Sequence, residues 1–263
     1  MSVGAGRAWR LWPPLALGLA LVGIWELYAD LSGVAEQVLP APHQVASALW
    51  SNGSLIWHNF AVTAEQVVLG LALALAGGFA LALALHMAPT LRRAIYPLAV
   101  GSQAVPIPVI GVLLVFWWGF GIVPKLAVIA LICFFPVVVS TLDALASLDR
   151  EQSKLMRTLE ASRWQSLRFA ELPAALPAAL SGARIALAVG VIGAFIAETS
   201  TPTGEAYAGL GREIITDAGG FQAPRAYAAT VVLVAFALAC FHALSMAERA
   251  LLPWHARTRG QTA

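Results

Sequence analysis

Charged residues are scarce in this chain. Asp, Glu, Lys and Arg make up 11% of its 263 residues, whereas soluble domains usually contain about 25%. Hydrophobic residues make up 59% and gather in long runs, and no polar segment is long enough to form a separate soluble domain. The composition therefore predicts an all-α integral membrane protein with a single transmembrane domain, residues 1–263.

Cysteines are also few. The chain has two, Cys133 and Cys240, and both fall inside apolar segments. No cluster of Cys and His surrounds either residue, so we expect neither a disulfide nor a metal site. We interpret both as small apolar packing residues.

Several motifs of catalytic proteins are missing. No G-x-x-x-x-G-K-[ST] segment occurs, so we do not expect this chain to bind ATP through a P-loop. Neither H-E-x-x-H nor G-x-S-x-G occurs, and Ser102 has no base at a suitable spacing, which disfavours an intramembrane hydrolase. We therefore expect a protein that is not an enzyme, binds no cofactor and contacts no nucleic acid.

Six apolar runs are long enough to cross a membrane. They cover residues 11–28, 60–86, 94–120, 126–142, 182–197 and 226–246. The first could be taken for a signal peptide, but no convincing cleavage site follows it, so we expect an uncleaved span. The segment 30–59 between the first two runs has no Lys or Arg, and its L-P-A-P at 39–42 precedes a predicted short helix at 43–50.

The third run is interrupted near its middle by Ser102, Gln103, Pro106 and Pro108. Proline removes a backbone donor, so the freed carbonyls must find other partners or line a cavity. This stretch is the best candidate for a translocation path, and a kink packed against neighbouring helices is the alternative. Glu198, which ends the fifth run, is a further candidate for the path.

The second run contains one acid and three glycines of interest. Glu65 lies about one turn inside the run, where it is either a functional intramembrane acid or an interface residue that reaches water, and we prefer the second interpretation. Gly70, Gly77 and Gly78 are expected to permit close approach of another helix.

The distribution of positive charge predicts the orientation. With both ends of the chain in the cytoplasm, 13 of the 16 Lys and Arg residues fall in inside segments, and three, Lys125, Arg212 and Arg225, fall outside. Cytoplasmic loops of membrane proteins carry such an excess of Lys and Arg. The segment 149–177, between the fourth and fifth runs, is then cytoplasmic.

The segment 149–177 is the one long polar stretch, and it shows two helix starts. Asp149 with Gln152, and Ser162 with Gln165, each fit a capping box. We expect two short amphipathic helices that meet near 160–161, with the second limited by Pro173. A loop that only sets topology would not need two apolar faces, and a partner protein is one candidate to cover them.

This segment resembles the cytoplasmic coupling loop of bacterial ABC-importer permeases. Its L-P at 172–173 matches the family pattern, and K-L-M at 154–156 stands where the family has Glu-Ala-Ala, as is usual in the nitrate, sulfonate and taurine branch. Glu160 stands where the family has Gly. A Glu held in the left-handed region costs roughly 1 kcal/mol, so either the turn has another shape or Glu160 accepts strain.

Other segments resemble the same family. The stretch 119–140 matches its G-F-G-x-x-x-K and F-F-P pattern, and I-A-E at 196–198 and G-L-G at 209–211 are typical of it. The resemblance implies an inner-membrane permease, a homodimer, whose partners are two copies of an ABC ATPase that uses the ATP and an external substrate-binding protein. It implies an ATPase-contacting turn made of six residues, Leu159, Glu160, Ala161, Ser162, Arg163 and Trp164.

The S-Q-x-V-P sequence at 102–106 resembles the permeases for pyrimidine precursors and riboflavin more than those for sulfonates. It favours a thiamine pyrimidine precursor or riboflavin as the transported solute, with sulfonates, taurine and nitrate as alternatives. The rival function is an ion-coupled secondary transporter. Such a protein normally has more spans, internal repeats and several intramembrane ionisable groups. Glu65 and Glu198 alone are too few ionisable groups for ion coupling.

Overall fold

The structure, a computed structural model, describes residues 5–146, 150–200, 202 and 207–251. Its described residues form helices joined by turns and short loops, with no strand among them. Five helices within these described ranges are long and apolar enough to cross a membrane. They are α1 (Ala5–Leu31), α3 (Gly53–Met87), α6 (Ile122–Ala146), α9 (Leu172–Thr199) and α11 (Ala223–Leu251).

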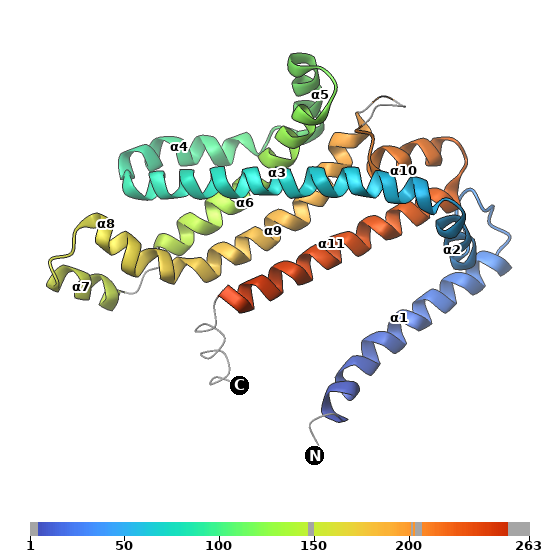
Figure 1. Cartoon of the computed structure of the whole chain (residues 1–263), viewed down its shortest axis with the longest axis horizontal. Coiled ribbons are helices and arrows are strands. Elements are labelled where there is room, and N and C mark those ends of the chain that lie inside the picture. Colours follow the sequence, from blue (N-terminus) through green and yellow to red (C-terminus); the bar gives the residue numbers. More distant parts are fainter. Residues whose placement is uncertain (1–4, 147–149, 201, 203–206, 252–263) are drawn as a thin grey trace.

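Helices α3, α6 and α9 form the centre of the molecule (Figure 1). Their facing sides are built of small and β-branched residues, including Val67, Ala74, Ile129, Val137, Ala186 and Ala194. A Cβ on Gly70 would collide with Ile129, and one on Gly78 would lie 2.8 Å from Val137. The predicted close approach is therefore confirmed at these two glycines, whereas Gly77 faces Phe134 at an ordinary contact distance.

The third apolar run forms two helices rather than one. Helix α4 (Pro89–Ser102) and helix α5 (Ile107–Trp118) are separated by the non-helical residues 103–106. Pro106 is the N-cap of α5 and Pro108 lies in its first turn, so neither needs to donate an N–H there. The predicted interruption is confirmed, and the two halves point in different directions (Figure 1).

Short helices occupy the two ends of the bundle. Helices α2 (Pro42–Ser51) and α10 (Leu210–Gly219) lie at one end, and α7 (Arg150–Thr158) and α8 (Arg163–Ser166) lie at the other (Figure 1). The short helix expected at 43–50 is thus confirmed. Helix α1 runs apart from the centre (Figure 1) and touches α11 through Trp25 and Tyr227, whose ring centroids are 6.1 Å apart.

One expectation for the polar segment is wrong. Pro173 does not end the second short helix, because α8 continues through a π-helical segment, η1 (Leu167–Glu171), directly into α9. The wider π turn shifts the hydrogen-bond register immediately before the proline, and Pro173 itself lies in the first turn of α9. The missing N–H of Pro173 therefore does not stop the helix.

Candidate functional site

The turn after α7 has the hydrogen bonds of a Schellman motif. The N–H of Ala161 donates to the carbonyl of Met156 at 3.0 Å, and the N–H of Glu160 donates to the carbonyl of Arg157 at 3.0 Å. Glu160 has φ = 51°, which is the left-handed conformation that this motif requires and that glycine adopts most readily. Of the two alternatives left by the sequence, Glu160 therefore accepts the strained conformation.

Helix α8 begins with the predicted capping box. The hydroxyl of Ser162 accepts from the N–H of Gln165 at 3.3 Å, and the side chain of Gln165 accepts from the N–H of Ser162 at 2.7 Å. These two bonds satisfy backbone donors that the helix start leaves open. The first predicted box lies outside the described residues, because it depends on Asp149.

A polar contact joins this segment to the end of α3. The Nε2 atom of His86, in the last turn of α3, lies 2.5 Å from Oε2 of Glu171 in η1. The guanidinium of Arg163 donates to the backbone carbonyl of His86 at 3.1 Å. Neither His86 nor Glu171 was predicted as a site residue, and the available signal was a single polar residue at the end of an apolar run.

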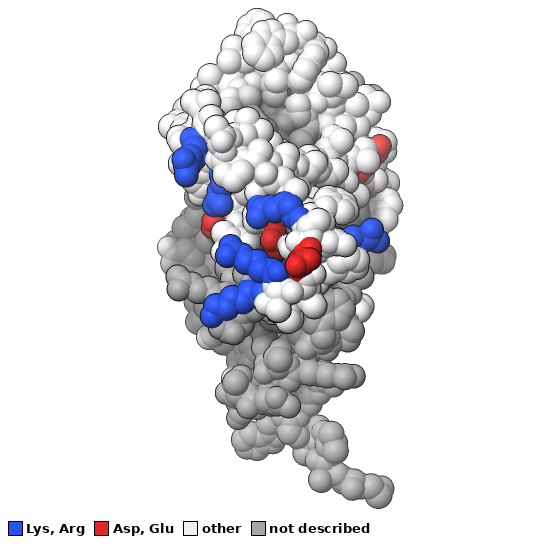
Figure 2. Space-filling model, turned by 90° about the vertical axis from the view of Figure 1, so that its left-hand side faces the viewer, with Lys and Arg blue, Asp and Glu red and all other residues white. Residues whose placement is uncertain are grey.

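The segment from α7 to η1 exposes apolar side chains. Leu155, Leu159, Trp164 and Phe169 are between 59% and 68% exposed. Figure 2 shows that Lys and Arg side chains gather on the same end of the molecule. Apolar side chains outside a membrane span need a covering surface, so this end has the properties of a contact site for another protein.

At the opposite end, Glu198 is fully buried. Its carboxylate accepts from the hydroxyl of Thr63 at 2.8 Å and from the N–H of Gly211 at 2.7 Å. The Thr63 oxygen accepts in turn from the N–H of Leu210 at 2.8 Å. A threonine of α3 and a carboxylate of α9 thus satisfy the first N–H groups of α10, where negative charge is also favoured by the helix dipole.

The G-L-G sequence at 209–211 is explained by this contact. A Cβ on Gly209 would collide with the Glu198 carboxylate, and one on Gly211 would lie 2.8 Å from it. Next to this turn, the Tyr207 carbonyl accepts from Nζ of Lys125 at 2.6 Å and from Nε2 of Gln66 at 3.2 Å. The Glu198 cluster therefore binds the chain between α9 and α10 to α3 and α6.

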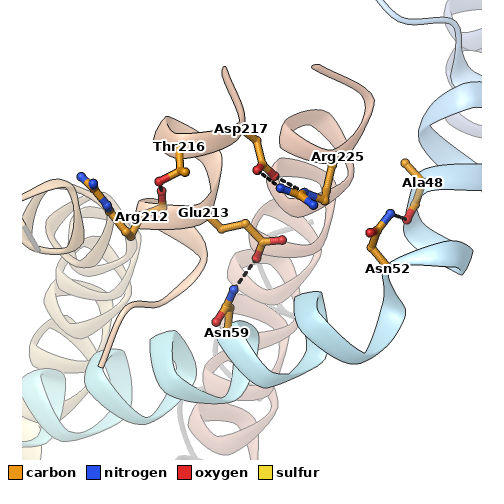
Figure 3. A network of polar contacts seen from close by, with 8 residues as sticks. All are labelled: Ala48, Asn52, Asn59, Arg212, Glu213, Thr216, Asp217 and Arg225. Carbon is orange, nitrogen blue, oxygen red and sulfur yellow. Dashed lines mark hydrogen bonds and ion pairs between the residues drawn. The ribbon is translucent and has the colours of Figure 1, made fainter. Parts of the chain in front are cut away.

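Further polar contacts hold α10 in place (Figure 3). The side-chain amide of Asn59, from α3, donates to Oε2 of Glu213 at 2.7 Å. Arg225 forms an ion pair with Asp217, with Nε 2.6 Å from Oδ2. Burial raises the pKa of Glu213 above its usual range, against the opposing effect of the Asn59 hydrogen bond.

A cavity of about 280 Å³ lies beside the break between α4 and α5. Among its described lining residues Gln103 is the one polar side chain, and the others are Val105, Ile107, Ile110, Leu131, Ile132, Phe135, Pro136 and Val189. These come from the break itself and from α5, α6 and α9. The site therefore combines an apolar wall with a single amide.

The structure brings together some of the predicted site residues and separates others. The six residues expected to contact the ATPase, 159–164, cover the turn after α7 and the first two residues of α8. Of the path candidates, Gln103 lines the cavity, whereas Pro106 is the N-cap of α5 and Glu198 lies in its own cluster beside α10. The side chain of Ser102 lies outside the described part of the structure.

Comparison with known proteins decides the family. The model of the family described as "Binding-protein-dependent transport system inner membrane component" matches residues 66–254. The chain belongs to this family. It is therefore a permease subunit of an ABC transporter, a multi-pass inner-membrane protein whose family implies an ATPase and a binding protein as partners. This result removes the ion-coupled secondary transporter as a rival interpretation.

Three relatives match nearly the whole chain. The formylaminopyrimidine transport permease protein ThiX of Halalkalibacterium halodurans is 32% identical, with 94% of this chain and 98% of ThiX covered. The riboflavin permease RibX of Chloroflexus aurantiacus is 32% identical, with coverage of 93% and 92%. The taurine permease TauC of Escherichia coli is 31% identical, with coverage of 94% and 93%.

A solved structure shares the fold. The chain matches one titled "Crystal structure of an amino acid ABC transporter with histidines", with a TM-score of 0.58 and 16% identity. The match covers 77% of this chain and 95% of the solved one. At this identity the comparison bears on the fold alone.

Proposed function

We propose that the chain crosses the inner membrane six times, with α4 and α5 together forming the third span and both termini in the cytoplasm. The end that carries α7 and α8 is then cytoplasmic, and the end that carries α2 and α10 is external. The support is the excess of Lys and Arg on the α7–α8 side of the six predicted spans. Chemical labelling of single cysteines introduced at exposed positions of α7 and α10, from each side of the membrane, tests this orientation.

The turn at 159–164 is the contact for the ATPase, and two ATPase copies act on a homodimer of this chain. The observation that carries this assignment is the Schellman turn at Glu160, flanked by the exposed side chains of Leu159 and Trp164. A rigid turn that presents apolar anchors is a suitable contact for a groove on a partner. ATP-driven movement of this turn would shift the permease between inward-open and outward-open states, because the ATPase binds the two states differently.

The solute passes at the interface of the two copies, beside the break between α4 and α5. Ser102, Gln103 and Pro106 belong to this path, and Glu198 supports its external end. The cavity beside Gln103 carries this part of the proposal, because it brings an amide to an otherwise apolar wall. Non-helical backbone within a membrane is tolerated where it lines such a cavity.

The solute is an uncharged heterocycle, with a thiamine pyrimidine precursor or riboflavin as the best choices. None of the described residues that line the Gln103 cavity is a cation, and a sulfonate or nitrate ion would need compensating donors in a site of this kind. The amide of Gln103 can donate to and accept from the polar edge of a ring, and Phe135 offers a face for stacking. Two of the relatives are named as permeases for such solutes.

Ligand binding to the partner protein tests the choice of solute. The binding protein is recovered by crosslinking to the tagged permease in intact cells, identified and purified. We expect its melting temperature to rise with a hydroxymethyl- or formylamino-pyrimidine or with riboflavin, and not with taurine or nitrate. The substitution Gln103→Leu should then lower uptake of the same solute without releasing the ATPase. A binding protein that is stabilised by taurine alone would contradict the proposal that the solute is a heterocycle.

A further inference from the structure

A second hollow opens on α4, away from the Gln103 cavity. Its volume is about 420 Å³, and its lining consists of Pro89, Arg92, Arg93, Tyr96 and Pro97. These residues cover the first turns of α4, at the end of the molecule that also carries α7 and α8 (Figure 1). In the proposed orientation this hollow lies at the level of the cytoplasmic lipid headgroups.

The two arginines of the hollow have no acidic partner in the part of the chain that the structure describes. Among the described residues, neither Arg92 nor Arg93 forms an ion pair, whereas Arg184 pairs with Glu248 and Arg225 pairs with Asp217. Two arginines that line the same hollow make it attractive to an anion. Guanidinium groups bind phosphate through paired, charge-assisted hydrogen bonds.

The surroundings of the hollow favour a lipid over a free anion. Leu98 and Val100, further along α4, are 73% and 46% exposed, so an apolar surface continues from the hollow toward the middle of the membrane. Pro97 has no N–H, which leaves the Arg93 carbonyl without its usual helical donor. That carbonyl can accept a hydrogen bond from a hydroxyl of the headgroup.

We propose that Arg92, Arg93 and Tyr96 bind the phosphate of an anionic phospholipid, with its acyl chains along Leu98 and Val100. The site rests on the proposed orientation of the chain but is separate from the solute path and from the 159–164 turn. Basic pockets on the cytoplasmic side of membrane proteins are a known kind of lipid headgroup site. The lipid would neutralise the two arginines and hold α4 against the bilayer.

The test measures lipid binding to the full chain, purified with whatever partner subunits remain attached. The double variant R92Q/R93Q is compared with R249Q, which removes an exposed arginine on α11 that does not line the hollow. Each protein is titrated with phosphatidylglycerol, with phosphatidylcholine of the same chains, and with inorganic phosphate. Retained lipid per protomer is read by native mass spectrometry, and the melting temperature is read in parallel.

We expect phosphatidylglycerol to bind the wild type and R249Q equally, and R92Q/R93Q about tenfold to thirtyfold more weakly. If the double variant does not fold, the single variants R92Q and R93Q replace it, and each should lose less phosphatidylglycerol binding than the double variant. Equal binding of the two lipids by the wild type, or unchanged binding by R92Q/R93Q, would overturn the site. If inorganic phosphate binds as tightly as phosphatidylglycerol does, the ligand is not a lipid. If R92Q/R93Q loses the ATPase but binds lipid as the wild type does, the hollow is not a lipid site.

Discussion

The hydroxyl of Thr63 donates to the carboxylate of Glu198 across 135 residues of sequence. The same oxygen accepts from the N–H of Leu210, so one threonine connects α3, α9 and α10. This contact gives Glu198 a definite role in the structure, as the buried anion at the start of α10. It also explains why glycines surround that carboxylate.

Replacing Thr63 with valine should destabilise the protein. The change keeps the shape of the side chain but leaves the Leu210 N–H and one Glu198 oxygen without this partner. Unsatisfied buried groups cost about 1 to 3 kcal/mol each, so we expect the melting temperature in detergent to fall by about 5 to 15 °C. Thr216→Val is the control, because the exposed Thr216 hydroxyl donates only within its own helix. Equal melting temperatures for the two variants would show that the Thr63 contact contributes nothing.

Replacing Glu213 with glutamine should change how stability depends on pH. Burial raises the pKa of Glu213 in the folded protein, so its favourable contribution is complete below the ordinary Glu pKa of about 4.3 and is lost as the pH rises through the folded value. Glutamine stays neutral and can still accept from Asn59. The melting temperature of E213Q relative to wild type should therefore increase from acid to neutral pH. A difference that is constant with pH, or that decreases, would contradict the buried environment of Glu213.

Substitutions at Glu160 should follow the preference for a left-handed backbone. We expect Glu160→Gly to stabilise the end of α7 by up to about 1 kcal/mol, and Glu160→Val to destabilise it by a similar amount. Glu160→Asn should lie between them, because asparagine tolerates this conformation. Hydrogen exchange at the Ala161 amide, which closes the turn, reports the order directly. If valine protects that amide as well as glycine does, Glu160 is not held at positive φ.

Replacing Ala161 with glutamate should abolish transport. A bulky charge in the 159–164 turn would disturb an apolar contact with the ATPase, while the membrane spans are untouched, so the variant should insert normally and lose its ATPase. Gln152→Glu is the matched control, since it adds the same charge at an exposed position on α7. Normal uptake by the Ala161 variant would remove this turn from the contact.

Local sequence signals predicted the parts of the fold that local interactions determine. The Ser162–Gln165 capping box lies within four residues of sequence, and the proline interruption after α4 follows from the missing N–H groups. The continuation of the helix through Pro173 was not predicted, because a π turn depends on how η1 packs and has no signal in the composition.

Contacts between distant segments could not be predicted from one sequence. The I-A-E and G-L-G segments were each recognised, but nothing in either shows that the carboxylate of Glu198 lies in the glycine turn. The contact of His86 with Glu171 spans 85 residues and joins an apolar run to a polar loop. Such pairings depend on how α3, α9 and the segment before α9 pack, which pattern and spacing alone do not determine.

The most direct test of the account is to purify the tagged chain in mild detergent and identify its partners by mass spectrometry. A permease subunit of an ABC importer should retain an ATPase with a P-loop in a one-to-one ratio, and the Ala161→Glu variant should lose it. Recovery of a homo-oligomer without any ATPase, reproduced after crosslinking in the membrane, would contradict the assignment of the 159–164 turn and the coupling of this chain to ATP.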